Sequence, residues 1–205
     1  MPWLDHAPNR LHRYFADGWY DLYDGVVVAQ DAQLTVCDLV LSVTLNAQLD
    51  TRNKVWHVWR QRAEVEQILA RIPVEVSLQS ATLPWDDLYA LFAAFCGIRY
   101  AAEAVTTKVL HKKRPQLIPI YDRVLGEFFR PQIEPRIWRQ GGAPFLITYM
   151  RLFRDLLVVH EREIAELTQF VTDAGWQVTP VRVLDVLLWM EMEPSGYYRQ
   201  ADTTP

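Results

Sequence analysis

Residues 107–125, TKVLHKKRPQLIPIYDRVL, combine a cluster of cations with a carboxylate at the start of a helix. Pro115 ends the helix that precedes it, and Asp122 begins the next one. The first amides of a helix have no intrahelical partner and carry the positive end of its dipole, so a helix start beside cations can bind an anion. The cations, called the basic run below, are His111, Lys112, Lys113 and Arg114.

The charge of this segment differs from that of the whole chain. With 21 Lys and Arg against 25 Asp and Glu, the net charge is −4. Residues 104–140 nevertheless carry eight basic residues against three acids. This asymmetry predicts one anion-facing surface on an acidic body, although a solvated helix end whose cations suit the negative pole would explain the run equally well. The predicted nucleic-acid contacts are Lys108, His111, Lys112, Lys113, Arg114, Tyr121 and Arg123.

Helical patterns position these residues, and no stretch alternates as βαβ units do. We therefore predict an all-α fold of about seven to nine helices in one domain that spans residues 1–205. An irregular arm over residues 1–30, with a short helix from Asn9 to Phe15 and a break at Gly18, and a frayed tail over residues 194–205 are expected at its ends. The predicted helices cover residues 35–49, 51–72, 84–96, 101–111, 122–129, 146–171 and 180–190. Thr35 followed by Asp38 resembles a capping box at the start of the first of these helices, and Thr179 with Pro180 opens the last.

Other polar residues have simpler structural interpretations. Arg182 and Asp185, three residues apart in an otherwise apolar helix, are expected to form a buried structural ion pair rather than a catalytic one. Asp86 and Asp87 suit the first turn of a helix better than a metal or acid–base site. His160 is expected in the core, because no second ligand stands at metal spacing. We predict neither a metal nor a cofactor.

The composition is that of an ordinary globular protein. Cys37 and Cys96 form neither a disulfide framework nor a metal cluster, which suits a reducing compartment. The first residues, MPWLDHAP, do not read as a signal peptide, and uncharged runs reach only about eleven residues, too few to span a membrane. We therefore expect a soluble cytoplasmic protein without a membrane partner.

Two motifs carry a resemblance to known families. KxLHKKRPxLIPIYDxV at residues 108–124 and VRVLDVLLWM at residues 181–190 resemble an uncharacterised bacterial family of domains of unknown function. Through the first motif, that family resembles the helix-hairpin-helix DNA glycosylases, in which an Asp begins a helix after apolar-Pro-x-Asp. Residues 119–122, PIYD, match with one additional residue between proline and acid. This resemblance implies a two-lobed helical bundle whose lobes meet near residues 104–140.

The resemblance also implies a hairpin with two glycines whose amides grip a phosphate, and a lysine nucleophile in the members with lyase activity. At the spacing of those enzymes, the glycines would fall near Tyr100 and Ala102 and the lysine near Ala104, so this chain departs from the pattern. Lys108 is expected to contact a phosphate. The alternative is a nucleophilic amine, which would need a pKa lowered by burial or by the neighbouring cations of the basic run.

Asp122 fits two compatible roles. As an N-cap, it accepts a hydrogen bond from an amide two or three residues further on, which contributes about 1 kcal/mol. As the catalytic carboxylate that the resemblance implies, it would stabilise positive charge on a deoxyribose or orient a water. Tyr121 beside it would stack on a base or fill the core.

Together these features predict a DNA-contacting helical protein which, as an enzyme, is a monofunctional DNA N-glycosylase. It would extrude a base into the cleft between its lobes and leave an abasic site without cutting the strand. The alternative is a non-catalytic module that uses the basic run for a protein or RNA partner. The missing hairpin glycines favour this alternative, because a side chain there obstructs close approach of backbone to phosphate.

Overall fold

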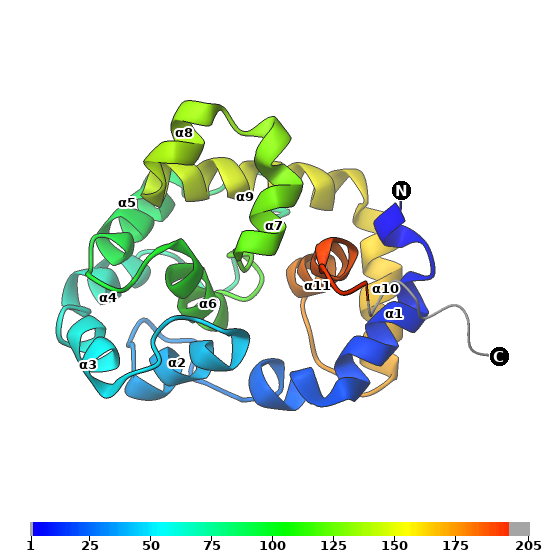
Figure 1. Cartoon of the computed structure of the whole chain (residues 1–205), viewed down its shortest axis with the longest axis horizontal. Helices are drawn as coiled ribbons and strands as arrows, with labels where there is room; N and C mark the ends of the chain where they lie inside the picture. The colour runs from blue at the N-terminus through cyan, green and yellow to red at the C-terminus, as the bar shows by residue number, and fades with distance from the viewer. Residues whose placement is uncertain (1, 197–205) are drawn as a thin grey trace.

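The computed structural model describes residues 2–196, and within them the chain is entirely helical, with eleven α-helices and no strand (Figure 1). The prediction of an all-α fold is confirmed. There are more helices than the seven predicted ranges because α1 (Ala7–Tyr14), expected only as a short helix of the arm, and α8 (Pro135–Gln140) lie outside those ranges and two predicted helices are interrupted. One becomes α3 (Arg52–Arg60) and α4 (Ala63–Leu69), and the other becomes α9 (Gly142–Val159) and α10 (Glu161–Asp173).

The N-terminal segment is helical rather than an irregular arm. It consists of a 3-10 turn (Pro2–Leu4), α1 (Ala7–Tyr14) and a π-helical stretch called η2 (Phe15–Asp24). Gly18 at φ +86° produces the one sharp kink within η2. The segment is ordered because its apolar side chains recur at helical spacing and are buried, so that α1 packs against α10 and α11 (Pro180–Met192).

The next helices begin and end where local sequence signals place them. α2 (Val36–Leu41) starts with the expected capping box, in which Thr35 and Asp38 bond each other's backbone amides. It continues as the 3-10 turn η3 (Ser42–Leu45). After α3 and α4, α5 (Trp85–Cys96) begins behind Pro84 with two acids in its first turn.

Helix α6 (Glu103–Lys113) follows α5 through a short turn and carries the basic run near its end. A proline-rich connection leads to α7 (Arg123–Phe129), then to the 3-10 turn η4 (Arg130–Gln132) and α8 (Pro135–Gln140). Helix α9 packs along α5, and α11 packs against α7, α9 and α10.

Figure 1 shows α2 to α6 on one side of the molecule, and α1, α10 and α11 on the other, with α7, α8 and α9 above them. One continuous hydrophobic core nevertheless connects both sides. The division into two lobes therefore stays a prediction. Most of the expected frayed tail lies outside the described residues. None of the described helices combines the length and hydropathy that crossing a bilayer requires.

Candidate functional site

A cleft opens between η3, α6, α7 and α11. It consists of an outer chamber of about 590 Å³, lined by residues from all four elements, and a smaller inner chamber of about 80 Å³ that reaches the buried polar groups of α11. The two chambers adjoin, and five residues line both of them. These residues are Leu45, Asn46, Lys108, Asp122 and Trp189.

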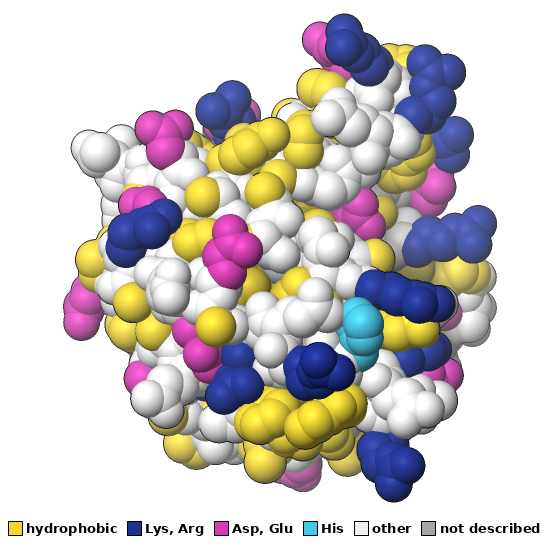
Figure 2. Space-filling view, turned by 90° about the vertical axis from the view of Figure 1, so that its left-hand side faces the viewer, with side chains coloured by type: hydrophobic (Ala, Val, Ile, Leu, Met, Phe, Trp, Pro, Cys, Tyr) yellow, Lys and Arg dark blue, Asp and Glu magenta, His cyan; other side chains and the backbone are white. Residues whose placement is uncertain are grey.

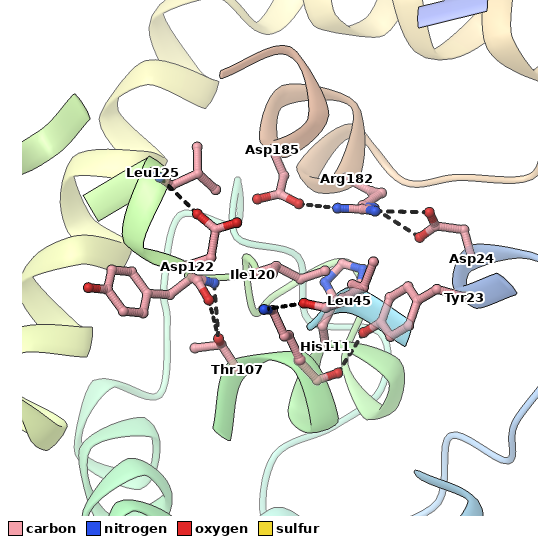
Figure 3. A network of polar contacts seen from close by, with 12 residues as sticks. Tyr23, Asp24, Leu45, Thr107, His111, Ile120, Asp122, Leu125, Arg182 and Asp185 are labelled. Carbon is pink, nitrogen blue, oxygen red and sulfur yellow. Dashed lines mark hydrogen bonds and ion pairs between the residues drawn. The ribbon is translucent and has the colours of Figure 1, made fainter. Parts of the chain in front are cut away.

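Asp122 stands at the junction of the chambers and caps α7. Its carboxylate accepts a hydrogen bond from the amide of Leu125 at 2.9 Å, so the predicted N-cap is confirmed. The segment before Asp122 is held in place by Thr107, whose hydroxyl accepts a hydrogen bond from the amide of Tyr121 at 2.9 Å. Figure 3 shows the Asp122 carboxylate turned toward Asp185. The catalytic role of Asp122 stays a prediction.

Lys108 approaches the same point from α6. Its ammonium donates a hydrogen bond to the carbonyl of Leu45 at 2.6 Å, and the residue is only 4% exposed. Burial lowers the pKa of Lys108, while the charges of Asp122 and Asp185 act in the opposite direction. Although sequence spacing did not indicate it, the cleft thus brings one lysine and two carboxyl groups together.

Arg182 and Asp185 form the buried ion pair that their spacing predicted. Arg182 also binds the carboxylate of Asp24 through two hydrogen bonds, of 2.9 and 3.0 Å, and donates to the hydroxyl of Tyr14 at 3.0 Å. The guanidinium of Arg182 is therefore hydrogen-bonded to two carboxyl groups, those of Asp24 and Asp185. One oxygen of Asp185, Oδ1, is buried and has no hydrogen-bond partner among the described residues.

Asp185 is the cleft residue whose importance the sequence analysis missed. Burial raises the pKa of its carboxyl to about 7, against the lowering influence of Arg182 and with the charge of Asp122 adding to the rise. Its position in an almost wholly apolar helix was the available signal, because a buried carboxyl group often carries a strongly shifted pKa.

The basic run does not form the exposed anion-facing surface that was expected. Lys113 is 1% exposed, and its ammonium binds the Asp38 carboxylate at 2.9 Å and the carbonyl of Ala29 at 2.8 Å. Arg114 is 3% exposed and donates to the carbonyls of Leu69 and Ile72, at 2.9 and 2.8 Å, where α4 ends. The negative pole of a neighbouring helix and the loop before α2 bind these cations, so they are not available to a polyanion.

His111 and Lys112 are also used within the protein. His111 is buried, its Nδ1 lies 2.7 Å from the carbonyl oxygen of Ile118, and burial lowers its pKa to about 4. Lys112 donates to the carbonyls of Tyr23 and Asp24, at 3.0 and 3.2 Å. The cations thus hold η2 and the segment after it against α6.

The two remaining predicted contacts lie at the outer chamber. Tyr121 is half-buried against Phe145, with ring centroids 4.9 Å apart, yet it also lines the chamber, so it combines the two predicted placements. Arg123, which follows Asp122, is exposed at the rim. Of the residues predicted to contact nucleic acid, Arg123 alone is exposed.

The turn between α5 and α6 contains a backbone conformation that usually favours glycine, but the residue in that conformation is not a glycine. Tyr100, where the resemblance places the first hairpin glycine, adopts φ +75°. The chain then enters α6 at Ala102, which has no side-chain cap. The start of α6 lines the outer chamber, although the carboxylate of Glu103 is engaged by the amide of Gly142 at 2.6 Å.

These features define an all-α protein with two carboxyl groups and a lysine in one cleft. Residues 6–192 match the model of a family described as a family of unknown function, DUF6308, and the chain belongs to this family. The family relationship indicated by the two sequence motifs is confirmed. No curated protein and no solved structure matches the chain. Among the described residues, no group of three or more His, Cys, Asp or Glu side chains is arranged to hold a metal.

Proposed function

We propose that the protein is a monofunctional DNA N-glycosylase in which Asp122 is the catalytic carboxylate. The observation that carries this proposal is the shared cleft, where Asp122, Lys108 and Asp185 meet at the end of a chamber large enough for a nucleoside. An enzyme that acts on a base in duplex DNA must extrude the nucleotide into such a pocket.

The chamber offers flat surfaces for a flipped base. Tyr100, Tyr121 and Trp189 line it, and Tyr100 is 39% exposed. Aromatic faces stack on bases and contribute about 1–3 kcal/mol per base. A base held between these rings would place its glycosidic bond at the junction of the chambers, with the sugar beside Asp122 and one edge of the base toward the inner chamber. There the Asp122 carboxylate stabilises the positive charge that develops on the deoxyribose as the glycosidic bond breaks.

Lys108 has a supporting role in this proposal. Burial lowers the pKa of Lys108, but the charges of Asp122 and Asp185 and the hydrogen bond to the Leu45 carbonyl favour its protonated form, which cannot attack the sugar. Lys108 lies close enough to Asp122 for the two charges to influence each other. We therefore expect hydrolysis without a covalent enzyme–sugar intermediate and without strand cleavage.

Because the buried basic run cannot contact DNA, exposed arginines would make the phosphate contacts in its place. Besides Arg123, the segment from α7 to α8 carries Arg130, Arg136 and Arg139 on the surface. Figure 2 shows Lys and Arg side chains concentrated on the right half of the face it presents and at its top, where α8 lies, whereas Asp and Glu side chains are spread over both halves. Such cations would bind phosphates beside the cleft without reading sequence.

The test is base release from duplexes that each carry one modified base, with and without hot alkali before electrophoresis. The proposal predicts strands that break only after alkali, because a monofunctional glycosylase leaves an intact abasic strand. Strand breaks without alkali that are lost in Lys108→Ala would contradict the monofunctional assignment.

The second candidate function is a non-catalytic module on the same scaffold, and the hairpin favours it. The side chains of Tyr100 and Ala102 occupy the places where glycines would let a phosphate approach the backbone. Asp122→Asn keeps an N-cap and removes the charge, so it separates the two functions. An enzyme would lose activity, whereas a binding module would keep its affinity.

A further inference from the structure

Asp185 occupies the inner chamber with its carboxyl group only half satisfied. Arg182 donates to one oxygen, Oδ2. The other oxygen, Oδ1, is buried without a hydrogen-bond partner among the described residues, and the residue lines the chamber opposite Asp122 (Figure 3). An unpartnered buried oxygen costs free energy, so its retention beside a cleft suggests that it serves a ligand.

The charges around Asp185 favour its neutral form. Three carboxyl groups, Asp24, Asp122 and Asp185, surround only two cations, Arg182 and Lys108. One proton on these three carboxyl groups removes the excess negative charge, and the carboxyl group with the least access to solvent is that of Asp185. Burial raises its pKa to about 7, which agrees with this assignment.

The other titratable groups near Asp185 do not supply that proton. They are three tyrosines and one histidine from the helices and segments packed around α11. Burial raises the pKa of the tyrosines and lowers that of the histidine, so all four side chains are neutral near pH 7. These groups are Tyr14, Tyr23, Tyr149 and His111.

We propose that Asp185 is the proton donor to the departing base in the cleft that Asp122 shares, an inference that rests on the proposed glycosylase function. The bond between C1′ and the base nitrogen breaks, its electron pair stays with the base, and the base takes the proton of Asp185. Water then adds to C1′ and loses a proton to Asp122. Asp122 releases that proton to solvent and Asp185 takes one up, so the sum is hydrolysis.

Asp185 and Asp24 provide a matched pair of variants. Both carboxylates bind Arg182, but only Asp185 lines the inner chamber, whereas Asp24 lines a separate hollow beside His111. Asp185→Asn and Asp24→Asn therefore disturb the same buried ion-pair network. A purely structural role for Asp185 would make the two variants behave alike.

The experiment compares two leaving groups under single-turnover conditions. Duplexes carry either a neutral base, uracil or hypoxanthine, or N7-methylguanine, which already bears a positive charge and leaves without protonation. Asp185→Asn should release the neutral base about 100-fold more slowly than wild type and release N7-methylguanine at nearly the wild-type rate. Asp24→Asn should affect both bases to the same extent.

Equal losses on both bases in Asp185→Asn, or no loss on either, would overturn the proton-donor role while leaving the proposed function intact. Undiminished release of both bases by Asp122→Asn would instead overturn the proposed function. Whatever the rates of base release, wild type should show an infrared band of a protonated carboxyl group at about pH 6, and this band should be missing in Asp185→Asn. Its presence in Asp185→Asn as well would overturn the assignment of the proton to Asp185.

Discussion

The carboxyl groups of Asp122 and Asp185 differ in their surroundings although they face the same cleft. Asp122 is half exposed and caps a helix, whereas Asp185 is buried and relies on a guanidinium that it shares with Asp24. Two carboxyl groups in unequal environments are what a division into charge stabiliser and proton donor requires.

The protonation of Asp185 predicts an unusual dependence of stability on pH. Its pKa in the folded state, about 7, lies above the usual value near 3.9, so between these values the folded protein binds a proton that the unfolded chain does not. The free energy of unfolding should therefore fall by about 2–4 kcal/mol as pH rises from 4 to 7, relative to Asp185→Asn. Urea titrations of both proteins measure this, and a pH-independent difference would contradict it.

The cap of α7 predicts different effects for two substitutions of Asp122. Asp122→Ala removes the acceptor for the Leu125 amide and should lower the free energy of unfolding by about 1 kcal/mol. Asp122→Asn retains an acceptor and should change it by less than about half of that amount. Chemical denaturation at neutral pH measures both values. A larger loss in Asp122→Asn would show that the cap depends on the charge.

Among the helices, α6 is held to neighbouring segments by the cations that it carries near its C-terminal end. Lys112, Lys113 and Arg114 each donate to backbone carbonyls of segments distant in sequence, and Lys113 also binds Asp38 at the start of α2. The basic run therefore organises the N-terminal third around α6. Its sequence resembles a nucleic-acid contact, but its structural role is to hold helices in place.

Substitution of Lys113 tests this role. Lys113→Met leaves the buried carboxylate of Asp38 without its cation and should cost about 3–5 kcal/mol of the free energy of unfolding. Arg136→Met, on the exposed surface of α8, should change it by no more than about 0.5 kcal/mol. Equal effects in equilibrium unfolding would show that the ion pair does not stabilise the fold.

The sequence predicted the helix starts better than it predicted the site. Thr35, Asp122 and Thr179 cap helices as expected, because a cap depends on residues within one turn. The burial of the basic run could not be predicted in this way, since its acceptors belong to other parts of the chain. The same holds for Asp185, whose shifted pKa depends on its burial and on the distant charge of Asp122.

At the scale of the whole molecule, charge is separated between the interior and the rim. The net charge is −4, and much of the positive charge near the cleft is buried, which leaves the arginines from Arg123 to Arg139 as the candidate phosphate contacts. Binding to DNA would then be local to Arg123 at the cleft and the exposed arginines from α7 to α8, and sensitive to salt.

The salt dependence of DNA affinity tests this arrangement. The double variant Arg136→Ala/Arg139→Ala should reduce the slope of log affinity against log salt by about 1–2, because each lost phosphate contact releases one counterion fewer. Lys112→Met, whose ammonium is engaged by backbone carbonyls, should leave the slope unchanged. Fluorescence anisotropy over a range of KCl concentrations gives the slopes. A wild-type affinity that does not change with salt would contradict binding of the protein to DNA phosphates.

The most direct measurement of the central claim is the single-turnover rate of base release by wild type and Asp122→Asn on the same lesion-bearing duplex. We predict that wild type releases the base and that Asp122→Asn does so at least about 100-fold more slowly, while it binds the duplex with similar affinity. Equal rates in the two proteins, or no release by wild type from any lesion tested, would contradict the assignment of the cleft as a glycosylase site.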